Sequence, residues 1–382
     1  MKKKTILVVT GTRAEYGLLR STMDAIRVRK DLTLSVLVTG MHTLKAFGNT
    51  QALIKKDGYP VAATVSIKES DSHTDALAKE IAGIGAYLER KRPDLVLVLG
   101  DRDEPLAAAL AAAHLQIPIA HVHGGDRSGF VIDEFIRHSL TKFSHLHFAI
   151  CKSSRNRILQ IGEESWRVFN VGAPGFDEIL GTKLIARERL ARELKLNPDR
   201  RWILVMQHPT ISDSVDIRSQ IRPLLEVLRN DYPQHEKIIV YPNSDNGSNI
   251  FIAEIKKFSD LPNFHIFKNL SRDLFLAAQK HSDAIVGNSS SGIIESGALR
   301  TPSLTIGGRQ RDRDRGANVV EANYDASGIR KGLRYILSPV FKKTVQNSKS
   351  PYGAGGAGKK IAKLIALQIC NPKLLQKRFV DR

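Results

Sequence analysis

Short apolar runs recur along this chain, and amphipathic stretches of helical length separate them. Runs of this kind are typical of parallel strands buried on both faces, because crossover helices cover the sheet on each side. In the first half we expect strands at residues 5–9, 34–38, 95–99 and 117–122. The second half repeats the scheme at residues 202–206, 238–241, 264–267, 284–286 and 303–306. The pattern predicts an α/β fold of two Rossmann-like, doubly wound domains facing a cleft.

The length of the chain also indicates two domains. It has 382 residues, and single domains usually contain roughly 100–200. Residues 171–175, Val-Gly-Ala-Pro-Gly, are rich in turn formers, so we place a hinge there. We expect an N-terminal domain over residues 1–173, a C-terminal domain over 174–350 and a basic tail over 351–382.

Charge and composition exclude several classes of protein. The net charge is +19, but residues 341–382 alone contain ten Lys or Arg and one Asp. A basic tail helix is more often a solvated face than a nucleic-acid reader, and aromatics make up only 6% of the chain. No apolar run approaches the ~18 residues of a membrane span. The apolar run near the start of the chain, residues 5–9, is too short for the apolar region of a signal peptide. We expect a cytoplasmic protein that binds neither nucleic acid nor membrane. Its two cysteines, Cys151 and Cys370, have no disulfide or metal-ligand spacing.

The most informative turn covers residues 288–295 and directly follows an expected strand. Its hydroxyls and the N–H groups of a following helix suit a phosphate, while an acidic residue one turn later is placed for ribose hydroxyls. The turn has neither a P-loop nor a dinucleotide signature. An ordinary capped helix has the same local pattern, so the turn alone leaves both interpretations open. The residues concerned are Ser289, Ser290, Ser291, Gly292 and Glu295.

Polar residues follow the other expected strands as well. Candidates for phosphate or nucleotide binding are Arg13 and Gly17 after the first strand, Arg102 after the third, and His208 and Asn243 in the second half. Each has an ordinary structural interpretation by itself. Ligands of doubly wound sheets bind at the carboxyl ends of the strands, and the shared placement there favours one nucleotide site.

These motifs together resemble the UDP-N-acetylglucosamine 2-epimerase family, in its hydrolysing branch of the sialic acid biosynthesis type. The resemblance extends from the first strand to about residue 319 and rests on residues 11–15, 100–102, 123–126, 133–138, 207–209, 288–292 and 308–310. It implies the GT-B type of fold, a UDP-sugar substrate, UDP as a product, a homodimer, and no metal or cofactor. It also implies that the tail helix crosses back to the first domain.

The resemblance implies a reaction through an elimination. A base removes the C2 proton of UDP-N-acetylglucosamine while UDP leaves C1, and water then adds to the 2-acetamidoglucal to give N-acetylmannosamine. A carboxylate base needs a raised pKa, which burial or neighbouring carboxylates provide. Asp101 and Asp133 match the acid/base pair of the family, with Asp126 and Glu134 beside them. The residues implied for UDP are Arg13, Arg102, His208, Asn243, Ser289, Ser290, Glu295 and Arg309, and His208 is also expected among the catalytic residues.

One departure concerns a position where many members carry a catalytic glutamate. This chain has His123 there, so either His123 transfers the proton or Asp126 takes that role. The difference leaves the sugar open, and UDP-N,N'-diacetylbacillosamine is an alternative substrate. A GT-B glycosyltransferase, which needs an acceptor for UDP release, and a nucleotide-sugar binding module are the alternatives of other classes.

Overall fold

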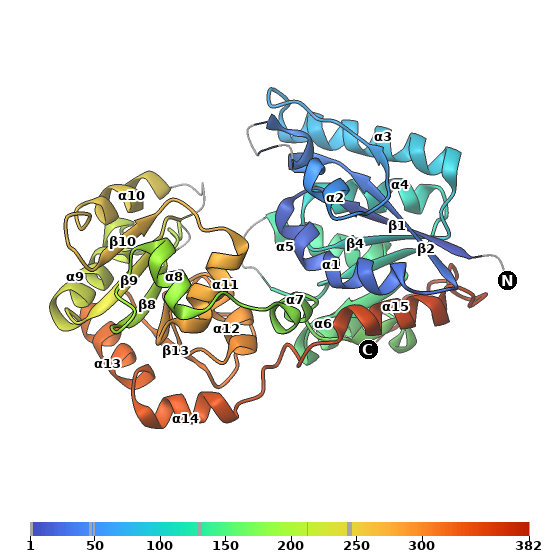
Figure 1. The fold of residues 1–382 in the computed structure, drawn as a ribbon. Helices are drawn as coiled ribbons and strands as arrows, with labels where there is room; N and C mark the ends of the chain where they lie inside the picture. Colours follow the sequence, from blue (N-terminus) through green and yellow to red (C-terminus); the bar gives the residue numbers. More distant parts are fainter. Residues whose placement is uncertain are drawn as a thin grey trace. The chain divides into compact units, whose positions relative to one another are not determined.

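Each half of the chain folds around its own parallel sheet (Figure 1). The computed structural model describes residues 3–45, 48, 50–127, 132–211, 213–242 and 247–381. The first compact unit comprises residues 1–178 and 355–382, and the second comprises residues 179–354. The chain therefore passes from one unit to the other at residues 178–179 and returns at residues 354–355.

The first unit has seven parallel strands in the order β3-β2-β1-β4-β5-β6-β7. The strands are β1 (Lys4–Thr10), β2 (Leu32–Val38), β3 (Val61–Thr64), β4 (Leu95–Leu99), β5 (Ile119–Val122), β6 (Leu146–Ala149) and β7 (Val168–Asn170). The helices are α1 (Arg13–Arg27), α2 (Gln51–Lys56), α3 (His73–Lys91), α4 (Asp103–His114), α5 (Ile132–Phe143), α6 (Lys152–Gln160), α7 (Gly175–Gly181), which continues into the second unit, and α15 (Ala357–Gln368), with 3-10 turns η1 (Gly40–Thr43) and η3 (Ser165–Arg167). The strand order reverses between β1 and β4, which is where such sheets bind ligands.

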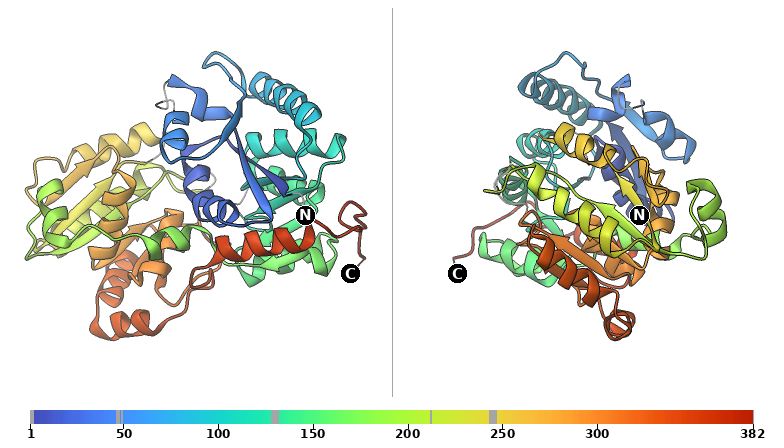
Figure 2. Two further views of the ribbon diagram at one scale, coloured as in Figure 1. Left: turned by 45° about the vertical axis from the view of Figure 1, so that its right-hand side comes forward. Right: turned by 90° about the vertical axis from the view of Figure 1, so that its left-hand side faces the viewer.

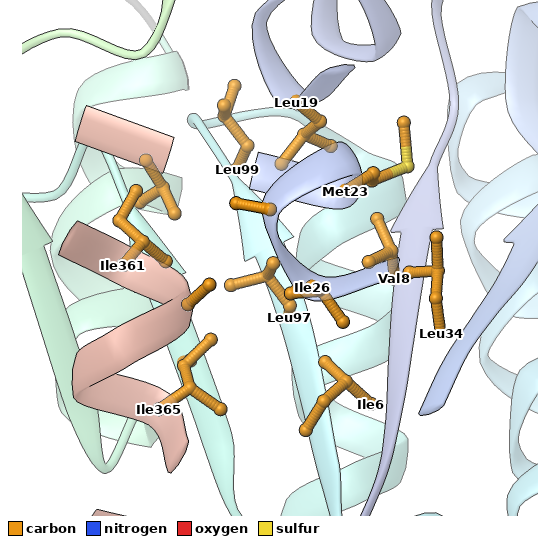
Figure 3. Close-up of a cluster of buried hydrophobic side chains, with 14 of the residues drawn as sticks. Ile6, Val8, Leu19, Met23, Ile26, Leu34, Leu97, Leu99, Ile361 and Ile365 are labelled. Atoms are coloured by element: carbon orange, nitrogen blue, oxygen red, sulfur yellow. The ribbon is translucent and has the colours of Figure 1, made fainter. Parts of the chain in front are cut away.

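Alternation along the central strands separates two hydrophobic layers. Ile6 and Val8 of β1 pack with α1 and α15 on one face, as Figure 3 shows. Leu7 and Val9 point to the opposite layer, which contains side chains of α3, α4 and α5. Both faces of the strand are therefore buried, which explains the unbroken apolar runs in the sequence.

The last helix completes the first unit. α15 lies beside α1 in Figures 1 and 2, and a Cβ atom on Gly358 would come within 2.5 Å of the Ser21 carbonyl carbon. Only glycine permits this approach of the two helices. The carboxylate of Asp177 accepts from the N–H groups of Ala357 (3.1 Å) and Gly358 (2.7 Å), so a side chain of the protein caps the glycine-rich start of α15.

The second unit has six parallel strands in the order β10-β9-β8-β11-β12-β13. They are β8 (Arg201–Met206), β9 (His235–Val240), β10 (Phe264–Phe267), β11 (Ala284–Gly287), β12 (Ser303–Ile306) and β13 (Val319–Ala322). The helices are α8 (Arg187–Leu194), α9 (Arg222–Asp231), α10 (Ser248–Lys256), α11 (Arg272–His281), α12 (Ile294–Leu299), α13 (Ala326–Ile336) and α14 (Pro339–Asn347), with 3-10 turns η4 (Arg218–Gln220) and η5 (Ser290–Gly292). The order reverses between β8 and β11, so their ends mark the ligand-binding position of this sheet.

The predicted fold class, two Rossmann-like units of alternating strands and helices, is confirmed. Every predicted strand overlaps an observed one, but β3, β6, β7 and β13 were missed. In the described residues, no helix combines the length and the apolar character that a membrane crossing requires.

Candidate functional site

The end of β4 positions the first candidate carboxylate. Gly100 follows the strand with φ +86°, a conformation that favours glycine, and Asp101 comes next. The ring of buried His121 on β5 hydrogen-bonds to the Gly100 carbonyl oxygen at 2.7 Å. This bond joins the ends of β4 and β5 and fixes the turn from which Asp101 projects.

Arg137 of α5 connects the candidate catalytic segments. Its side chain is buried, and its guanidinium donates to the Asp101 carboxylate, to Glu134 Oε2 at 2.7 Å and to the backbone oxygen of Asp126 at 3.3 Å. The end of β4, the turn at Asp126 and the helix α5 therefore meet at one cation. Sequence reasoning gave Arg137 no role, although its spacing of three residues from Glu134 on a helix is a usable signal.

Asp133 lies in the first turn of α5 and is half-buried. Burial and the nearby Asp101 carboxylate raise the pKa of Asp133, and the charge of Arg137 opposes them. A raised pKa gives a carboxylate more basic strength near neutral pH. Both oxygens of Glu134 have partners on the same helix, because its Oε1 is 3.1 Å from His138 Nε2 and its Oε2 accepts from Arg137.

The turn after β5 holds His123 and Asp126. His123 has a left-handed backbone, with φ +68°, and its N–H donates to the Phe148 carbonyl at 3.2 Å. Gly125 has φ +72°, and a Cβ atom there would lie 2.2 Å from the Ser154 carbonyl oxygen. This close packing fixes the backbone before Asp126, whose side chain is buried. Residues 128–131, between this turn and α5, lie outside the described residues.

A second pair of carboxylates lies at the end of β1. Buried Glu15 accepts from the N–H groups of Gly11 (2.9 Å) and Thr12 (3.1 Å), closing a capping box at the start of α1. Burial and the neighbouring Glu104 raise the pKa of Glu15 to about 8. Glu104 is 3.3 Å from the guanidinium of Arg102. Sequence reasoning singled out neither glutamate, because both are conventional first-turn acids of helices.

The phosphate-binding candidates of the first unit are at helix starts. Arg13 is the exposed first residue of α1, and Gly17 lies one turn later, where a Cβ atom would meet nothing within 4 Å. Arg102 precedes α4 and is partly exposed. The two arginines follow β1 and β4, the adjacent strands at which the sheet order reverses.

Asn288 organises the candidate site of the second unit. Its Oδ1 accepts from the His208 N–H at 2.7 Å, and its Nδ2 donates to the His208 carbonyl at 2.8 Å. Its backbone oxygen accepts from Arg309 and from Gln310, both at 3.2 Å. The buried amide therefore brings together three motifs that the sequence places far apart.

The serine turn has a tighter geometry than the helix start we expected. Residues Ser290–Gly292 form the 3-10 turn η5, and the helix α12 begins only at Ile294. Before the turn, Gly287 has φ +134°, and a Cβ atom there would lie 2.0 Å from the Met206 carbonyl oxygen. β8 and β11 thus come close together at their ends, and the chain must turn sharply after them. Ser289 and Ser291 hydroxyls are 2.9 Å apart in this turn.

The other two candidates in this unit have different settings. The Glu295 carboxylate accepts from Arg272 at 2.7 Å and from Gln279 at 3.3 Å, so a ribose would share it with these groups. Asn243 lies outside the described residues. Among the residues that are described, no group of three or more His, Cys, Asp or Glu side chains is arranged to hold a metal ion.

In the first unit, the site residues thus follow β1, β4 and β5 or lie on α5, and in the second unit the serine turn and His208 follow the two strands at which the order reverses. The family model for UDP-N-acetylglucosamine 2-epimerases matches residues 24–366 of this chain. The chain belongs to this family. Its sequence is 35% identical to the hydrolysing UDP-N,N'-diacetylbacillosamine 2-epimerase of Legionella pneumophila, over 98% of both chains. This likeness and others confirm the hydrolysing branch that the motifs indicated.

Two further family members are informative. Polysialic acid biosynthesis protein P7 of Escherichia coli is 35% identical, over 91% of this chain and 90% of its own. The structure of UDP-GlcNAc 2-epimerase from Neisseria meningitidis bound to UDP-GlcNAc superposes with a TM-score of 0.80 at 21% identity, over 94% of this chain and 99% of that one. The superposition supports the GT-B type of fold.

Proposed function

We propose that this protein is a hydrolysing 2-epimerase that converts a UDP-linked 2-acetamido sugar and water into UDP and the free sugar inverted at C2. The observation that carries the proposal is the group around Arg137, where Asp101, Asp133, Glu134 and the Asp126 backbone meet in a chain of this family. With UDP-N-acetylglucosamine as substrate, the product is N-acetylmannosamine.

Asp133 is our candidate for the base that removes the C2 proton. Burial and the Asp101 carboxylate raise its pKa above the ordinary value, which strengthens it as a base, and the half-buried position leaves part of it accessible to a sugar. The electron pair of the C2–H bond forms the C1–C2 double bond as the C1–oxygen bond to UDP breaks. Water then adds its oxygen to C1, and a proton returns to C2 from the opposite face.

Asp101, Asp126 and His123 are the candidates for that second proton transfer. Asp101 is fixed by Arg137, whereas the Asp126 and His123 turn is fixed by its backbone. A group on the face opposite the base must carry the proton that gives the inverted centre. We assign this role to Asp101 or Asp126, with His123 as the alternative donor.

We assign the UDP moiety to the second unit. The hydroxyls of Ser289, Ser290 and Ser291 offer donors for the phosphates, and Gly292 closes the turn that carries them, because its N–H donates to the Ser289 carbonyl. Arg309 lies beside them through its bond to Asn288. The buried side chain of His208 is fixed at its backbone by the same asparagine. Donors held in place before the reaction stabilise the charge that develops on departing UDP. We also assign Arg13 and Arg102 of the first unit to stabilising the negative charge of the departing UDP. Glu295 and Asn243 are assigned to binding the nucleoside.

The sugar has two candidates. The motifs and the likeness to the polysialic acid protein favour UDP-N-acetylglucosamine. The likeness to the Legionella enzyme favours UDP-N,N'-diacetylbacillosamine, which differs by an acetamido group at C4 and a methyl at C5. Both sugars have the acetamido group and C2 proton that the elimination requires. We further propose that the enzyme is a homodimer.

The test measures UDP release from each sugar nucleotide in the absence of an acceptor. We expect UDP with one of the two sugars and a kcat/KM at least tenfold above that of the other. The released sugar is identified by NMR as the manno-configured epimer. UDP release that requires an added acceptor, with C2 unchanged, would show a glycosyltransferase instead. Binding without any turnover would indicate a nucleotide-sugar binding module.

A further inference from the structure

The helix that carries Asp133 is anchored at its far end by the C-terminal tail. The ammonium group of Lys377 donates to the backbone oxygens of Thr141 (3.0 Å), Lys142 (2.7 Å) and Ser144 (2.7 Å). The carbonyls of Thr141 and Lys142 belong to the last turn of α5 and Ser144 follows it, where helix carbonyls lack partners within the helix and the dipole favours a cation. One lysine, more than 230 residues away, thus caps the helix.

Lys377 is also tied to a buried carboxylate. Its ammonium is 2.9 Å from Glu163 Oε2, and the side chain of Glu163 is fully buried. The same carboxylate accepts from Lys142 at 2.9 Å and contacts the His147 ring at 3.0 Å. Nearby positive charges and the His147 bond lower the pKa of Glu163 to about 2 despite its burial. Lys377 therefore belongs to a charged network next to α5, and its ammonium is held both by the backbone carbonyls at the end of α5 and by the Glu163 carboxylate.

The tail that carries Lys377, residues 373–380, is itself held along its length. Buried Arg167 donates to the backbone oxygens of Leu374 (2.6 Å) and Lys373 (3.1 Å). The N–H of Val380 donates to the Gly162 carbonyl at 2.9 Å. The Phe379 ring packs against Gly162 and lies 4.8 Å below the ammonium of Lys142. Backbone bonds on both sides thus fix the segment around Lys377.

We infer that Lys377 is a positioning residue for the reaction: it fixes the C-terminal end of α5 and thereby the placement of Asp133 and Glu134 relative to Asp101. This inference rests on the proposed function. Arg137 anchors the first turns of the same twelve-residue helix to Asp101. With both ends anchored, α5 cannot slide or tilt as a rigid body. A displacement of about 1 Å at reacting groups can cost on the order of 100-fold in rate.

The capping depends on the protonation of Lys377. Burial, opposed by Glu163, lowers the pKa of Lys377 to about 8. The groups that face it are Glu163, Lys142, Arg167, His145 and His147. Above pH 8 the amine loses the proton that supports these bonds. Arginine keeps its charge throughout this range, so Lys377→Arg separates the charge from the other groups that titrate.

The experiment compares Lys377→Met, Lys377→Arg and the control Lys373→Met, which removes an exposed cation from the same tail. We measure kcat and KM for UDP release between pH 6.5 and 9.5. In wild type we expect kcat to fall as pH rises through about 8. Lys377→Arg should retain its kcat to a pH at least one unit higher. Lys377→Met should lose at least tenfold in kcat at pH 7.5 with KM changed less than twofold, while Lys373→Met stays within twofold of wild type.

Hydrogen exchange separates this inference from the proposed function. Amides of residues 136–141, whose hydrogen bonds lie within α5, should exchange at least fivefold faster in Lys377→Met than in Lys373→Met, whether or not a sugar nucleotide is turned over. Unchanged exchange there, or an alkaline limb that Lys377→Arg does not move, overturns the inference. If wild type releases no UDP from either sugar, the proposed function fails and the role in the reaction fails with it, while the exchange result still decides whether Lys377 fixes α5. If Lys377→Met does not fold, the pH comparison of Lys377→Arg with wild type decides it.

Discussion

The buried guanidinium of Arg137 donates to the carboxylate of Asp101, joining the helix α5 to the end of β4. The same guanidinium binds Glu134 and the backbone of the Asp126 turn. A single cation thus sets the relative positions of the proposed acid/base groups. Because both carboxylates keep part of their surface exposed, the cation can organise them without sealing them from a substrate.

Replacing Arg137 should affect catalysis and stability together. Arg137→Met leaves Glu134 and Asp101 without their shared cation, which should cost about 3 kcal/mol of stability. Arg137→Lys keeps a charge but cannot bridge the same groups, so we expect a kcat at least 100-fold below wild type with a smaller loss of stability. Urea unfolding and UDP release measure the two effects.

The control for these variants is Arg189→Met, which breaks an exposed pair with Glu193. Exposed pairs contribute little, so its stability should change by less than about 0.5 kcal/mol. An Arg137→Met protein with the kcat of the control would contradict the role given to Arg137.

Asp133→Asn should abolish turnover, and so should Asp101→Asn. Removing a catalytic base or acid typically costs on the order of 100-fold to 10,000-fold. UDP binding should stay within threefold of wild type, because the nucleotide is assigned to the second unit. Turnover that persists in both variants would show that the catalytic assignment is wrong.

The pH dependence of kcat/KM should report the raised pKa of Asp133. The base must be ionised, so activity should fall as pH falls through a value above the ordinary Asp pKa of about 3.9. The charge of Asp103 is one of the causes that raise this pKa. Asp103→Asn should therefore move the acid limb to lower pH while turnover continues. A limb that stays in place, or moves to higher pH, would count against Asp133 as the base.

Glu15 should make the protein less stable as pH rises. Burial and Glu104 raise its pKa to about 8 in the folded protein, whereas the unfolded value is near 4.3. Between these values folding takes up a proton, so the free energy of unfolding should fall with rising pH by up to about 1.4 kcal/mol per pH unit. Glu15→Gln is neutral throughout, so its stability relative to wild type should increase from pH 5 to pH 8. Urea unfolding measures both proteins, and a difference in their free energies of unfolding that stays constant from pH 5 to pH 8 would refute this.

Asn288 should control nucleotide affinity. Asn288→Ala removes the side-chain amide that bonds to the N–H and the carbonyl of His208. The bond from Arg309 goes to the backbone oxygen of residue 288, so it changes only if the backbone moves. We expect UDP affinity to fall about tenfold and stability to fall by about 2 kcal/mol, because buried polar groups lose their bonds. Calorimetric titration with UDP measures the first effect. The control is Asn347→Ala, which changes an exposed residue at the end of α14 and should bind UDP as wild type does.

The central strands could be predicted from the sequence because both of their faces are buried, which leaves unbroken apolar runs. The missed strands have other reasons. β3, β7 and β13 have only three or four residues, most of which are partly exposed, and each is an edge strand of its sheet. β6 is wholly buried, but His147 interrupts its apolar run. That histidine is accommodated by Glu163, sixteen residues away, a contact that local patterns do not contain.

The candidate site was predictable as a set of strand ends but not as a set of contacts. Strand-end placement and motif resemblance selected Asp101, Asp133 and the serine turn. They did not indicate that Arg137 and Asn288 connect these segments, because both roles depend on side-chain bonds across long sequence separations. Lys377 is the extreme case, since its partners on α5 and at Glu163 are more than 200 residues away.

The most direct test of the proposed reaction is turnover in heavy water. The protein is incubated in D2O with UDP-N-acetylglucosamine and, separately, with UDP-N,N'-diacetylbacillosamine, and the products are followed by NMR. Our account predicts free UDP and a manno-configured sugar that carries one deuterium at C2, because the C2 proton is removed and solvent supplies its replacement. An epimerised sugar that keeps its original hydrogen at C2 would contradict the elimination. UDP-linked epimer as the sole product would contradict hydrolysis.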